Sequence, residues 1–411
     1  MPRHPCRAGK GGGVVRGASG RAYTFCGRAK NDLRIYDFVA RFVCYSRAGE
    51  KDLAPLCLAA QPARADESPS DYQIYPSVHE MTYGDSWILR PSANVLVEDG
   101  IDADTRARLD EALALKDIDA TPVTEVPAGG YQMNVLVGVK GSGGAVDTYV
   151  DQLVSSGALT PADGLFEKSD AYLLASLKGD AHAADTIVVL GSDTDSAFYG
   201  LTTLYQIFQQ LEGTLRLRGF VCSDWADVVS RGFIEGYYGN PWSTEDRVNL
   251  MTWGGCYKLN AYVYAPKDDP LHRTNWRGLY TDEEIARELR PRAEAGNRSK
   301  VRFVYALAPF HNSDGARRPF RFDSEAHYQE DLADLKAKYL QTIDAGVRQI
   351  ALLADDSTDW GRLYGNEATY LRILNDLTSW IHELQALRDA DGTPRYATLG
   401  VLALRKGFQR R

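Results

Sequence analysis

The sequence has few of the features that would point to a membrane protein, a metalloprotein or a disulfide framework. No stretch approaches the roughly 18 apolar residues of a membrane-spanning helix. Four of the 6 cysteines lie in residues 1–64, and these four form no CxxC pair and no zinc spacing. The glycine-rich turn Gly141–Gly144 lacks the lysine and the spacing of a phosphate-binding loop. We therefore predict no membrane span, no metal and no cofactor.

Positive charge is scarce over most of the chain. The formal net charge is -8, yet residues 1–64 hold 12 Lys and Arg against 4 Asp and Glu, a net of +8, so the remainder carries -16. Such an acidic body argues against nucleic acid as the main partner. The content of 44% hydrophobic and 25% charged residues is typical of globular proteins, and 411 residues suggest two or three domains.

Residues 1–65 differ from the rest and are interpreted as an atypical basic leader. The apolar run Leu53–Ala60 and the Ala63-Arg64-Ala65 triplet resemble the end of a secretory signal peptide, but Glu50 and Asp52 do not fit that pattern. One hypothesis is that the segment upstream is not native coding sequence. The alternative is a disordered basic arm.

Residues 71–225 alternate between apolar runs and helical spacing, which predicts a small N-terminal α/β domain. Three strands and two helices are expected, together with a strand or linker that leads out of the domain. They are the strands Asn94–Glu98, Met133–Val139 and Thr186–Leu190, the helices Asp102–Leu115 and Asp193–Phe208, and the segment Phe220–Trp225.

Residues 230–411 contain a repeating pattern of a strand followed by a helix. Strands are predicted to begin near residues 233, 260, 302 and 349, and such repeats are typical of a (β/α)8 barrel of the TIM type. One helix is expected to start within Ser243–Asp246, with Ser or Thr as its cap, and Pro291 is expected to break or kink another helix, Asp282–Arg298. A fifth strand is possible at Ala397–Leu404. Because a full barrel takes about 250 residues, we expect only about the first half of it, with a truncation or frame change near the C-terminus.

The most informative stretch is Gln349–Trp360, in which an apolar run meets two adjacent acids, Asp355 and Asp356. Parallel α/β folds place their chemistry at the carboxyl ends of strands, and mutual repulsion can leave one acid of a pair protonated. The alternative is a helix N-terminus, where Asp is a common cap. Polar residues also follow the other predicted strands, which favours a shared site. These are Glu235, Tyr237 and Tyr238, then Lys267, Asp268 and Asp269, and then His311 and Asn312.

Adjacent carboxylates on one loop are unsuited to flank a glycosidic bond at roughly 5 Å separation or more. They suit substrate assistance, in which a 2-acetamido group supplies the nucleophilic oxygen, one acid orients the amide and the other transfers protons. A second chemistry follows from the DDxxD pattern of Asp355, Asp356 and Asp359, which holds magnesium and diphosphate when it lies on a helix. A third interpretation is a non-catalytic carbohydrate-binding protein.

Three blocks of sequence closely resemble the β-N-acetylglucosaminidases of glycoside hydrolase family 84, which include bacterial enzymes labelled hyaluronidase and the animal O-GlcNAcases. They are RGFIEGYYGNPW (Arg231–Trp242), KLNAYVYAPKDDPLHR (Lys258–Arg273) and LLADD (Leu352–Asp356). The helix DTDSAFYGLTTLYQIF also resembles the end of the small α/β domain that precedes the barrel in bacterial members. The resemblance spans about residues 71–390. It implies retaining hydrolysis of terminal β-linked N-acetylglucosamine through an oxazoline, without a metal, on a glycan or glycoprotein partner.

The resemblance also implies roles for individual residues. Asp355 corresponds to the acid that orients the acetamido group and Asp356 to the general acid/base. Gly236 and Lys267 match positions that contact sugar hydroxyls, and the substrate-binding set includes Tyr237, where relatives often carry Phe, and Tyr238. Structural roles, capping or pairing with His272 and Arg273, are expected for Asp268 and Asp269. The secreted habit of bacterial members implies a secreted or cell-surface location.

Residues 397–411 depart from the family pattern. The family takes further site residues from strands five to eight, and none of those motifs is found here. We therefore expect this chain to hydrolyse a chromogenic N-acetylglucosaminide poorly, and an inactive truncated fragment is the alternative to an active enzyme.

Overall fold

A computed structural model describes residues 71–354 and 367–396, except 128, 181–182, 212–214 and 311–318, together with three short strands outside these ranges. The chain divides into two compact units, residues 1–62 and 63–411. In the first unit, only the strands β1 (Val14–Arg16) and β2 (Ala22–Thr24) are described, and they pair in antiparallel fashion. The features on which the leader interpretation rests lie outside the described residues.

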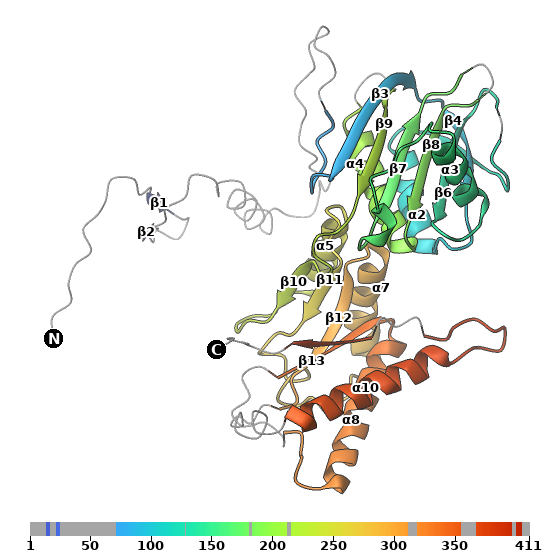
Figure 1. Ribbon diagram of the computed structural model, residues 1–411. Coiled ribbons are helices and arrows are strands. Elements are labelled where there is room, and N and C mark those ends of the chain that lie inside the picture. The colour runs from blue at the N-terminus through green and yellow to red at the C-terminus, as the bar shows by residue number, and fades with distance from the viewer. Residues whose placement is uncertain are drawn as a thin grey trace. The chain divides into compact units, whose positions relative to one another are not determined.

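The first part of the second unit is built on a seven-stranded mixed sheet in the order β3-β9-β7-β8-β6-β4-β5 (Figure 1). Strands β5, β4, β6 and β8 are parallel, whereas β7, β9 and β3 join by antiparallel pairing. The strands are β3 (Glu80–Ile88), β4 (Ser92–Val97), β5 (Asp119–Pro122), β6 (Met133–Val139), β7 (Tyr172–Leu177), β8 (Thr186–Gly191) and β9 (Arg216–Asp224).

Sequence patterns predicted β4, β6 and β8 but missed β3, β5 and β7. Both edge strands, β3 and β5, are largely exposed and therefore lack an apolar run that would mark them as strands. Strand β7 is buried, but its sequence YLLASL has no β-branched residue, so its apolar run did not distinguish a strand from a helix. The end of β9 coincides with the predicted segment from Phe220.

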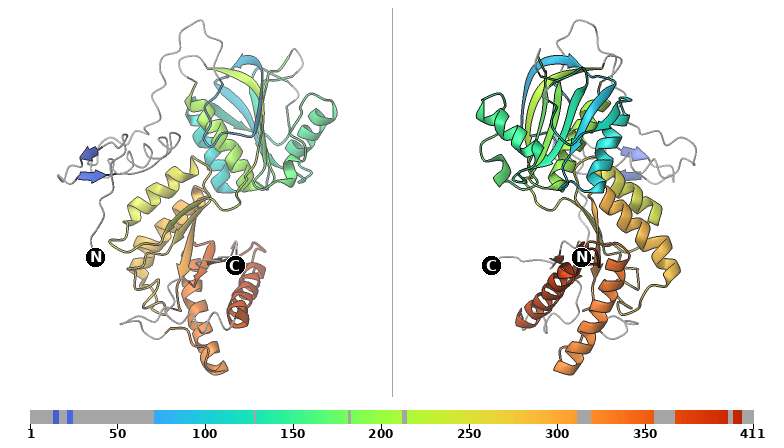
Figure 2. Two further views of the ribbon diagram at one scale, coloured as in Figure 1. Left: turned by 60° about the vertical axis from the view of Figure 1, so that its left-hand side comes forward. Right: turned by 90° about the vertical axis from the view of Figure 1, so that its right-hand side faces the viewer.

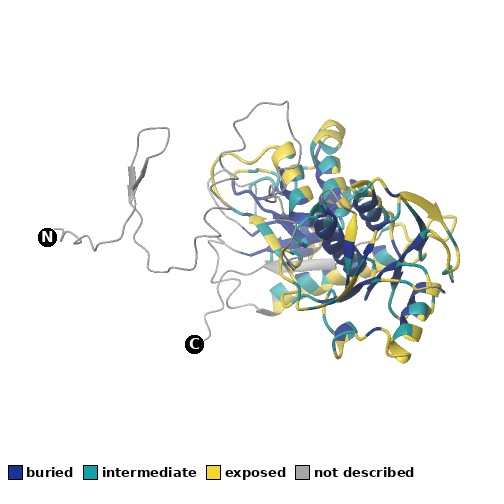
Figure 3. Cartoon of the chain, turned by 90° about the horizontal axis from the view of Figure 1, so that it is seen from above, coloured by how far each residue is buried: buried dark blue, intermediate teal, exposed yellow. Residues whose placement is uncertain are grey.

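Helices cover both faces of this sheet. Helices α2 (Ala103–Ala114) and α4 (Thr194–Gln209) share one core with alternate strand residues, whereas α3 (Ala145–Ser155) shares the other, which also includes the short helix η1 (Leu165–Glu167). Figure 3 shows the strands buried between helices whose outer faces are exposed. Burial on both faces explains why β6 and β8 are apolar at nearly every position.

The glycine-rich turn at residues 141–144 precedes α3, and the carboxylate of Glu98 caps this helix. Oε1 of Glu98 accepts hydrogen bonds from the backbone N–H groups of Val146 (2.8 Å) and Asp147 (3.2 Å). Because the protein's own carboxylate occupies the end of the helix where an anion would bind, the sequence-based interpretation as a plain turn is upheld. A cavity of about 490 Å³ lies beside this turn and is lined in part by Gly143 and Gly144.

The second part contains a sheet of five parallel strands that neighbour one another in sequence order, as in a barrel (Figure 2). Among the described residues, each of the first four strands is followed by helical structure, so this region is a partial (β/α) barrel. The strands are β10 (Gly232–Glu235), β11 (Ala261–Tyr264), β12 (Arg302–Leu307), β13 (Gln349–Leu353) and β14 (Gly400–Leu404). The helices are α5 (Thr244–Gly255), α6 (Asp282–Glu284), η2 (Ile285–Leu289), α7 (Arg290–Arg298), α8 (Glu325–Asp344) and α10 (Glu367–Ala386).

The two faces of the barrel strands differ in the size of their side chains. Large residues such as Tyr262, Phe303 and Tyr305 pack into the core shared with the helices. Small residues such as Ala261, Ala306 and others form a separate cluster on the opposite face. This alternation is expected where strands curve, because the inner face has less room than the outer one.

The helical segment at residues 282–298 continues through Pro291 without a break, but its hydrogen-bond pattern changes just before the proline. Its middle, η2, is a π-helical turn, and the N–H of Arg290 donates to the carbonyl of Ile285. Proline has no N–H for the bond to the preceding turn, and the wider π pattern shifts the hydrogen bonds just before it. The predicted cap of α5 is confirmed: Ser243 and Asp246 form a capping box.

Basic residues at the amino-terminal edge of the barrel strands contact acidic residues of the preceding domain. Lys258 and Lys300, each just before a strand, are buried and have left-handed backbone angles (φ 59° and 58°). In all these ion pairs the cation belongs to the barrel and the anion to the N-terminal domain. The pairs are Arg231–Asp170 (2.7 Å), Lys258–Asp224 (2.9 Å), Lys300–Asp102 (2.5 Å), Lys300–Asp195 (3.1 Å) and Arg302–Asp195.

A lysine on α8 is fully buried in the helix layer. Lys338 donates from Nζ to the carbonyl of Gly278 (2.5 Å), and its Nζ lies 3.8 Å from the ring centre of Tyr280. Burial lowers its pKa to about 7, although the negative charge of Asp269 acts in the opposite direction. The unfolded chain therefore binds this proton more tightly than the folded chain does.

We predict that Lys338→Met stabilises the fold below pH 7 by on the order of 3 kcal/mol. Below pH 7 Lys338 is charged in both the folded and the unfolded parent, so folding bears the full free-energy cost of burying the charge. Between pH 7 and about 10.5 the penalty shrinks, because only the unfolded chain holds the proton. Denaturant unfolding at pH 6 and pH 10 measures this difference. Lys336→Met on the same helix is the control, and an equal response of both variants would contradict the prediction.

Candidate active site

The candidate site lies at the carboxyl ends of the parallel barrel strands. Residue pairing places Glu235, the last residue of β10, opposite Tyr264 at the end of β11, and Tyr264 opposite Tyr305 of β12. The segments that follow these strands therefore leave the sheet at one edge. They include residues 236–242, which we call the β10 loop, and residues 265–273, which we call the β11 loop.

Glu235 stabilises the β10 loop through its buried side chain. Its side chain is buried and accepts two hydrogen bonds from Arg247 (2.8 Å each) and one from the hydroxyl of Tyr262 (2.5 Å). It also accepts the backbone N–H of Trp242 (3.2 Å), at the far end of the loop. Glu235 was expected among the polar residues at the carboxyl ends of the strands, but it lies in the helix-side layer, where its oxygens accept the hydrogen bonds of this network.

Aromatic side chains dominate the exposed part of the β10 loop. The rings of Tyr237 and Trp242 lie 5.7 Å apart at 60°, and both side chains are partly exposed. Burial, and then the charge of Glu235, raises the pKa of Tyr237. The ring of Tyr238 is 64% exposed and its hydroxyl oxygen accepts a hydrogen bond from Arg273 (2.9 Å).

The backbone conformation at position 236 does not require glycine. Its φ is not positive, and an added Cβ would meet only the side chain of Ile234, at 3.4 Å, so a tight turn is not the reason for glycine here. By contrast, Gly239 has φ +114° and needs the freedom of glycine. A glycine at position 236 leaves this part of the β10 loop without a side chain.

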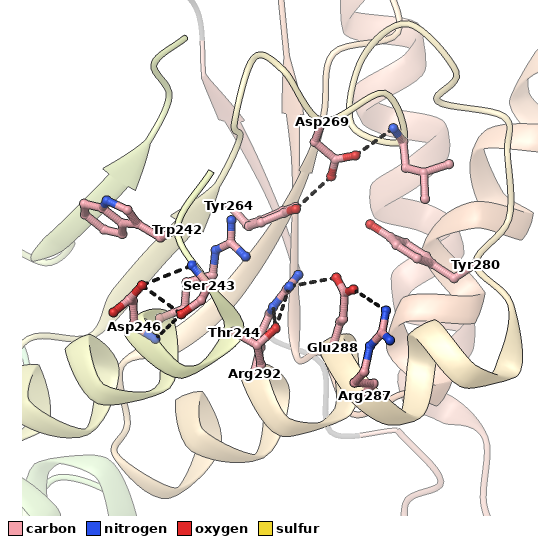
Figure 4. Close-up of polar contacts among 12 residues, drawn as sticks. Trp242, Ser243, Thr244, Asp246, Tyr264, Asp269, Tyr280, Arg287, Glu288 and Arg292 are labelled. Carbon is pink, nitrogen blue, oxygen red and sulfur yellow. Dashed lines mark hydrogen bonds and ion pairs between the residues drawn. The ribbon is translucent and has the colours of Figure 1, made fainter. Parts of the chain in front are cut away.

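The β11 loop supplies Lys267, Asp268 and Asp269. Lys267 is 8% exposed, and its backbone N–H donates to the carbonyl of Tyr237 (3.1 Å), so two predicted site residues are neighbours. Asp269 accepts hydrogen bonds from the Tyr264 hydroxyl and the Leu271 N–H (2.8 Å each; Figure 4). This capping contact agrees with the structural role expected for Asp269.

The expected side-chain partners of the two aspartates differ from the described contacts. Asp268 accepts the N–H of Gly239 (2.7 Å). Nδ1 of His272 contacts the carbonyl of Ala306 (2.7 Å), and Arg273 donates to Tyr238. Arg247 and Tyr262 were not singled out from the sequence, whereas Arg273 was expected to pair with an aspartate and instead donates to Tyr238. The local sequence signal for a buried partner of Glu235 was an arginine four residues beyond the helix cap.

The paired acids Asp355 and Asp356 lie outside the described residues, as do His311 and Asn312. The chain is described up to Ala354, which is buried directly after β13, so the acids follow the carboxyl end of that strand in sequence. Their assigned roles stay predictions. Among the described residues, no group of three or more His, Cys, Asp or Glu is placed to hold a metal, and no helix is long and apolar enough to span a membrane.

Two family models match the chain. The model described as beta-N-acetylglucosaminidase matches residues 231–388, and the model for domain 2 of glycosyl hydrolase family 20 matches residues 71–225. The Protein O-GlcNAcases of Rattus norvegicus and Mus musculus are each 36% identical over 125 residues, which is 30% of this chain and 12% of each relative.

Solved structures extend the similarity over both parts of the chain. CpGH84D is 35% identical with a TM-score of 0.69, and the match covers 78% of this chain and 50% of that one. CpGH84B is 25% identical with a TM-score of 0.61, and the match covers 81% of this chain and 50% of that one. The chain thus spans about half the length of these solved relatives. It is a β-N-acetylglucosaminidase-like protein of glycoside hydrolase family 84.

Proposed function

We propose that this chain hydrolyses terminal β-linked N-acetylglucosamine from glycans or glycoproteins. The observation that carries the proposal is the junction of Lys267 with the loop of Gly236, Tyr237 and Tyr238. It lies on the first two strands of a parallel sheet whose fourth strand leads directly into Asp355 and Asp356. A buried cation, aromatic rings and a following acid pair suit a sugar that carries an amide.

The proposed mechanism is substrate-assisted. Asp355 accepts the acetamido N–H, and the amide oxygen attacks the anomeric carbon while Asp356 gives its proton to the departing oxygen. The products of this step are a bound oxazoline in its N-protonated form, whose N–H donates to Asp355, and a free alcohol. Asp356, now ionised, takes a proton from water as the water oxygen attacks the anomeric carbon. The bond between that carbon and the oxazoline oxygen breaks, and the acetamido group is restored with retained configuration. Acid–base chemistry by this chain's residues accounts for both steps.

Matched aryl glycosides test the proposal. The N-acetylglucosaminide should be hydrolysed, at the low rate expected above, and the glucoside, which lacks the acetamido group, should not be hydrolysed. A stable bicyclic analogue of the oxazoline should bind at least 10²-fold more tightly than N-acetylglucosamine. Equal rates on the two glycosides would refute assistance by the substrate. Sugar binding without turnover and without preference for the analogue would instead support the non-catalytic interpretation.

We also propose a secreted or cell-surface location, supported by the apolar run Leu53–Ala60 and the Ala63-Arg64-Ala65 triplet. Fractionation of the natural host should find the protein in the medium or at the surface. Recovery from the cell interior alone would refute this location.

A further inference from the structure

The β11 loop holds three consecutive residues of the β10 loop, each by a different group. The N–H of Lys267 donates to the carbonyl of Tyr237, Arg273 donates to the hydroxyl oxygen of Tyr238, and the carboxylate of Asp268 accepts the N–H of Gly239. Glu235 holds the far end of the same loop through the N–H of Trp242. The β11 loop therefore holds Tyr237 and Tyr238, whereas Glu235 at the end of β10 holds Trp242.

Asp268 makes the shortest of these contacts, 2.7 Å, although its residue is exposed to solvent. An exposed carboxylate is well hydrated and gains from a backbone N–H only when that group is presented in a fixed direction. The backbone of Gly239, with φ +114°, turns its N–H toward the β11 loop. Gly239 has a backbone conformation that favours glycine, and this conformation directs its N–H at the carboxylate of Asp268. We interpret this hydrogen bond as a specific link between the two loops.

The contact at Tyr238 has a chemical consequence. Because Arg273 is the donor in the 2.9 Å bond, the phenolic oxygen of Tyr238 is the acceptor and its own O–H stays available as a donor. The ring is largely exposed, so this O–H is directed to solvent or to a ligand. Displacement of the loop would move the hydroxyl of Tyr238 and the rings of Tyr237 and Trp242 together.

We propose that Asp268 is a positioning residue for sugar binding, which rests on the proposed function. It does not touch the sugar but closes the β10 loop so that Gly236, Tyr237 and Tyr238 face the substrate in one arrangement. These residues would contact the sugar equally in the ground state and in the transition state. Loss of the closure should therefore raise KM and leave kcat nearly unchanged.

Three variants of the full chain test this inference. Asp268→Ala removes the acceptor of the Gly239 N–H and should raise KM for the aryl N-acetylglucosaminide about tenfold. Asp268→Asn keeps an acceptor oxygen and should stay within about twofold of the parent. Asp246→Ala is the matched control, because this exposed carboxylate accepts the N–H of Ser243 (3.2 Å) just beyond the β10 loop and caps α5 (Figure 4). The control should lose some stability but keep its KM.

Amide hydrogen exchange of residues 236–242 provides a readout that needs no sugar. Exchange in this segment should be about tenfold faster in Asp268→Ala than in the parent and in Asp268→Asn. Unchanged exchange in Asp268→Ala, or faster exchange without a rise in KM, would overturn the inference. If exchange accelerates but the parent neither binds nor hydrolyses the sugar, the closure stands and the proposed function fails. If Asp268 only stabilised the fold, Asp268→Ala would lower the amount of active enzyme and leave its KM unchanged.

Discussion

Asp356→Ala should lower turnover of an N-acetylglucosaminide with a poor leaving group by about 10²–10⁴, the usual contribution of a general acid. For an activated nitrophenyl glycoside the first step needs little proton donation, so its loss should be much smaller. The measurement is kcat/KM for a series of leaving groups, and the variant's slope against leaving-group pKa should be steeper than the parent's. Equal losses across the series would exclude Asp356 as the acid.

The neighbouring acids supply matched controls for this experiment. Asp355→Ala should lower turnover for all leaving groups alike, because orientation of the acetamido group does not depend on the departing oxygen. Asp359→Ala should have little effect on a glycosidase. If Asp359 proved as important as Asp355 and Asp356, and activity required magnesium and a diphosphate substrate, the DDxxD interpretation would replace the glycosidase.

Asp224→Ala should lower the free energy of unfolding by about 3–5 kcal/mol, because it leaves the ammonium of Lys258 buried without its counter-charge. Asp224, at the end of β9, is 4% exposed, and one of its oxygens accepts hydrogen bonds from Lys258 Nζ (2.9 Å) and the Tyr172 hydroxyl (2.7 Å). The other oxygen contacts Nδ1 of His79 (2.8 Å). Lys258 belongs to the barrel, so the loss also weakens the attachment of the N-terminal domain.

A double-mutant cycle separates the ion pair from simple loss of packing. Asp224→Leu combined with Lys258→Met removes both charges, and this double variant should be more stable than the Asp224→Ala single variant. Asp227→Ala is the control, because this 76% exposed partner of His79 should contribute less than about 1 kcal/mol. A double variant as unstable as the sum of its single variants would show that the two charges do not interact.

The same pair predicts a pH dependence. Burial opposes ionisation of Asp224, but Lys258 and the hydrogen bonds from His79 and Tyr172 outweigh it, so the pKa of Asp224 lies below its ordinary value of 3.8. Its contribution to stability is therefore complete above that value and is lost as the pH falls through the lower folded-state pKa. In Asp224→Ala this part of the acid-induced loss of stability should be missing.

Sequence patterns predicted the elements that repeat or are buried. Apolar runs marked β6, β8, β12 and β13, and Ser243 marked the start of α5. The exposed edge strands were missed because they lack an apolar run. The π turn before Pro291 was missed because a proline in a helical pattern ordinarily indicates a break. The site was only partly predictable, since Arg247 and Arg273 act through residues that lie 12 and 35 positions away.

The sequence by itself determined the family resemblance, the order of the barrel strands and the position of the acid pair directly after the fourth of them. These follow from local composition and from motifs that need no partner elsewhere in the chain. Only the tertiary structure decided that Glu235 is a buried partner of Arg247 rather than a residue exposed at the site, and that Asp268 links the β11 loop to the β10 loop. A side chain's role in such a site depends on which distant groups satisfy its oxygens, and local sequence carries no record of those partners.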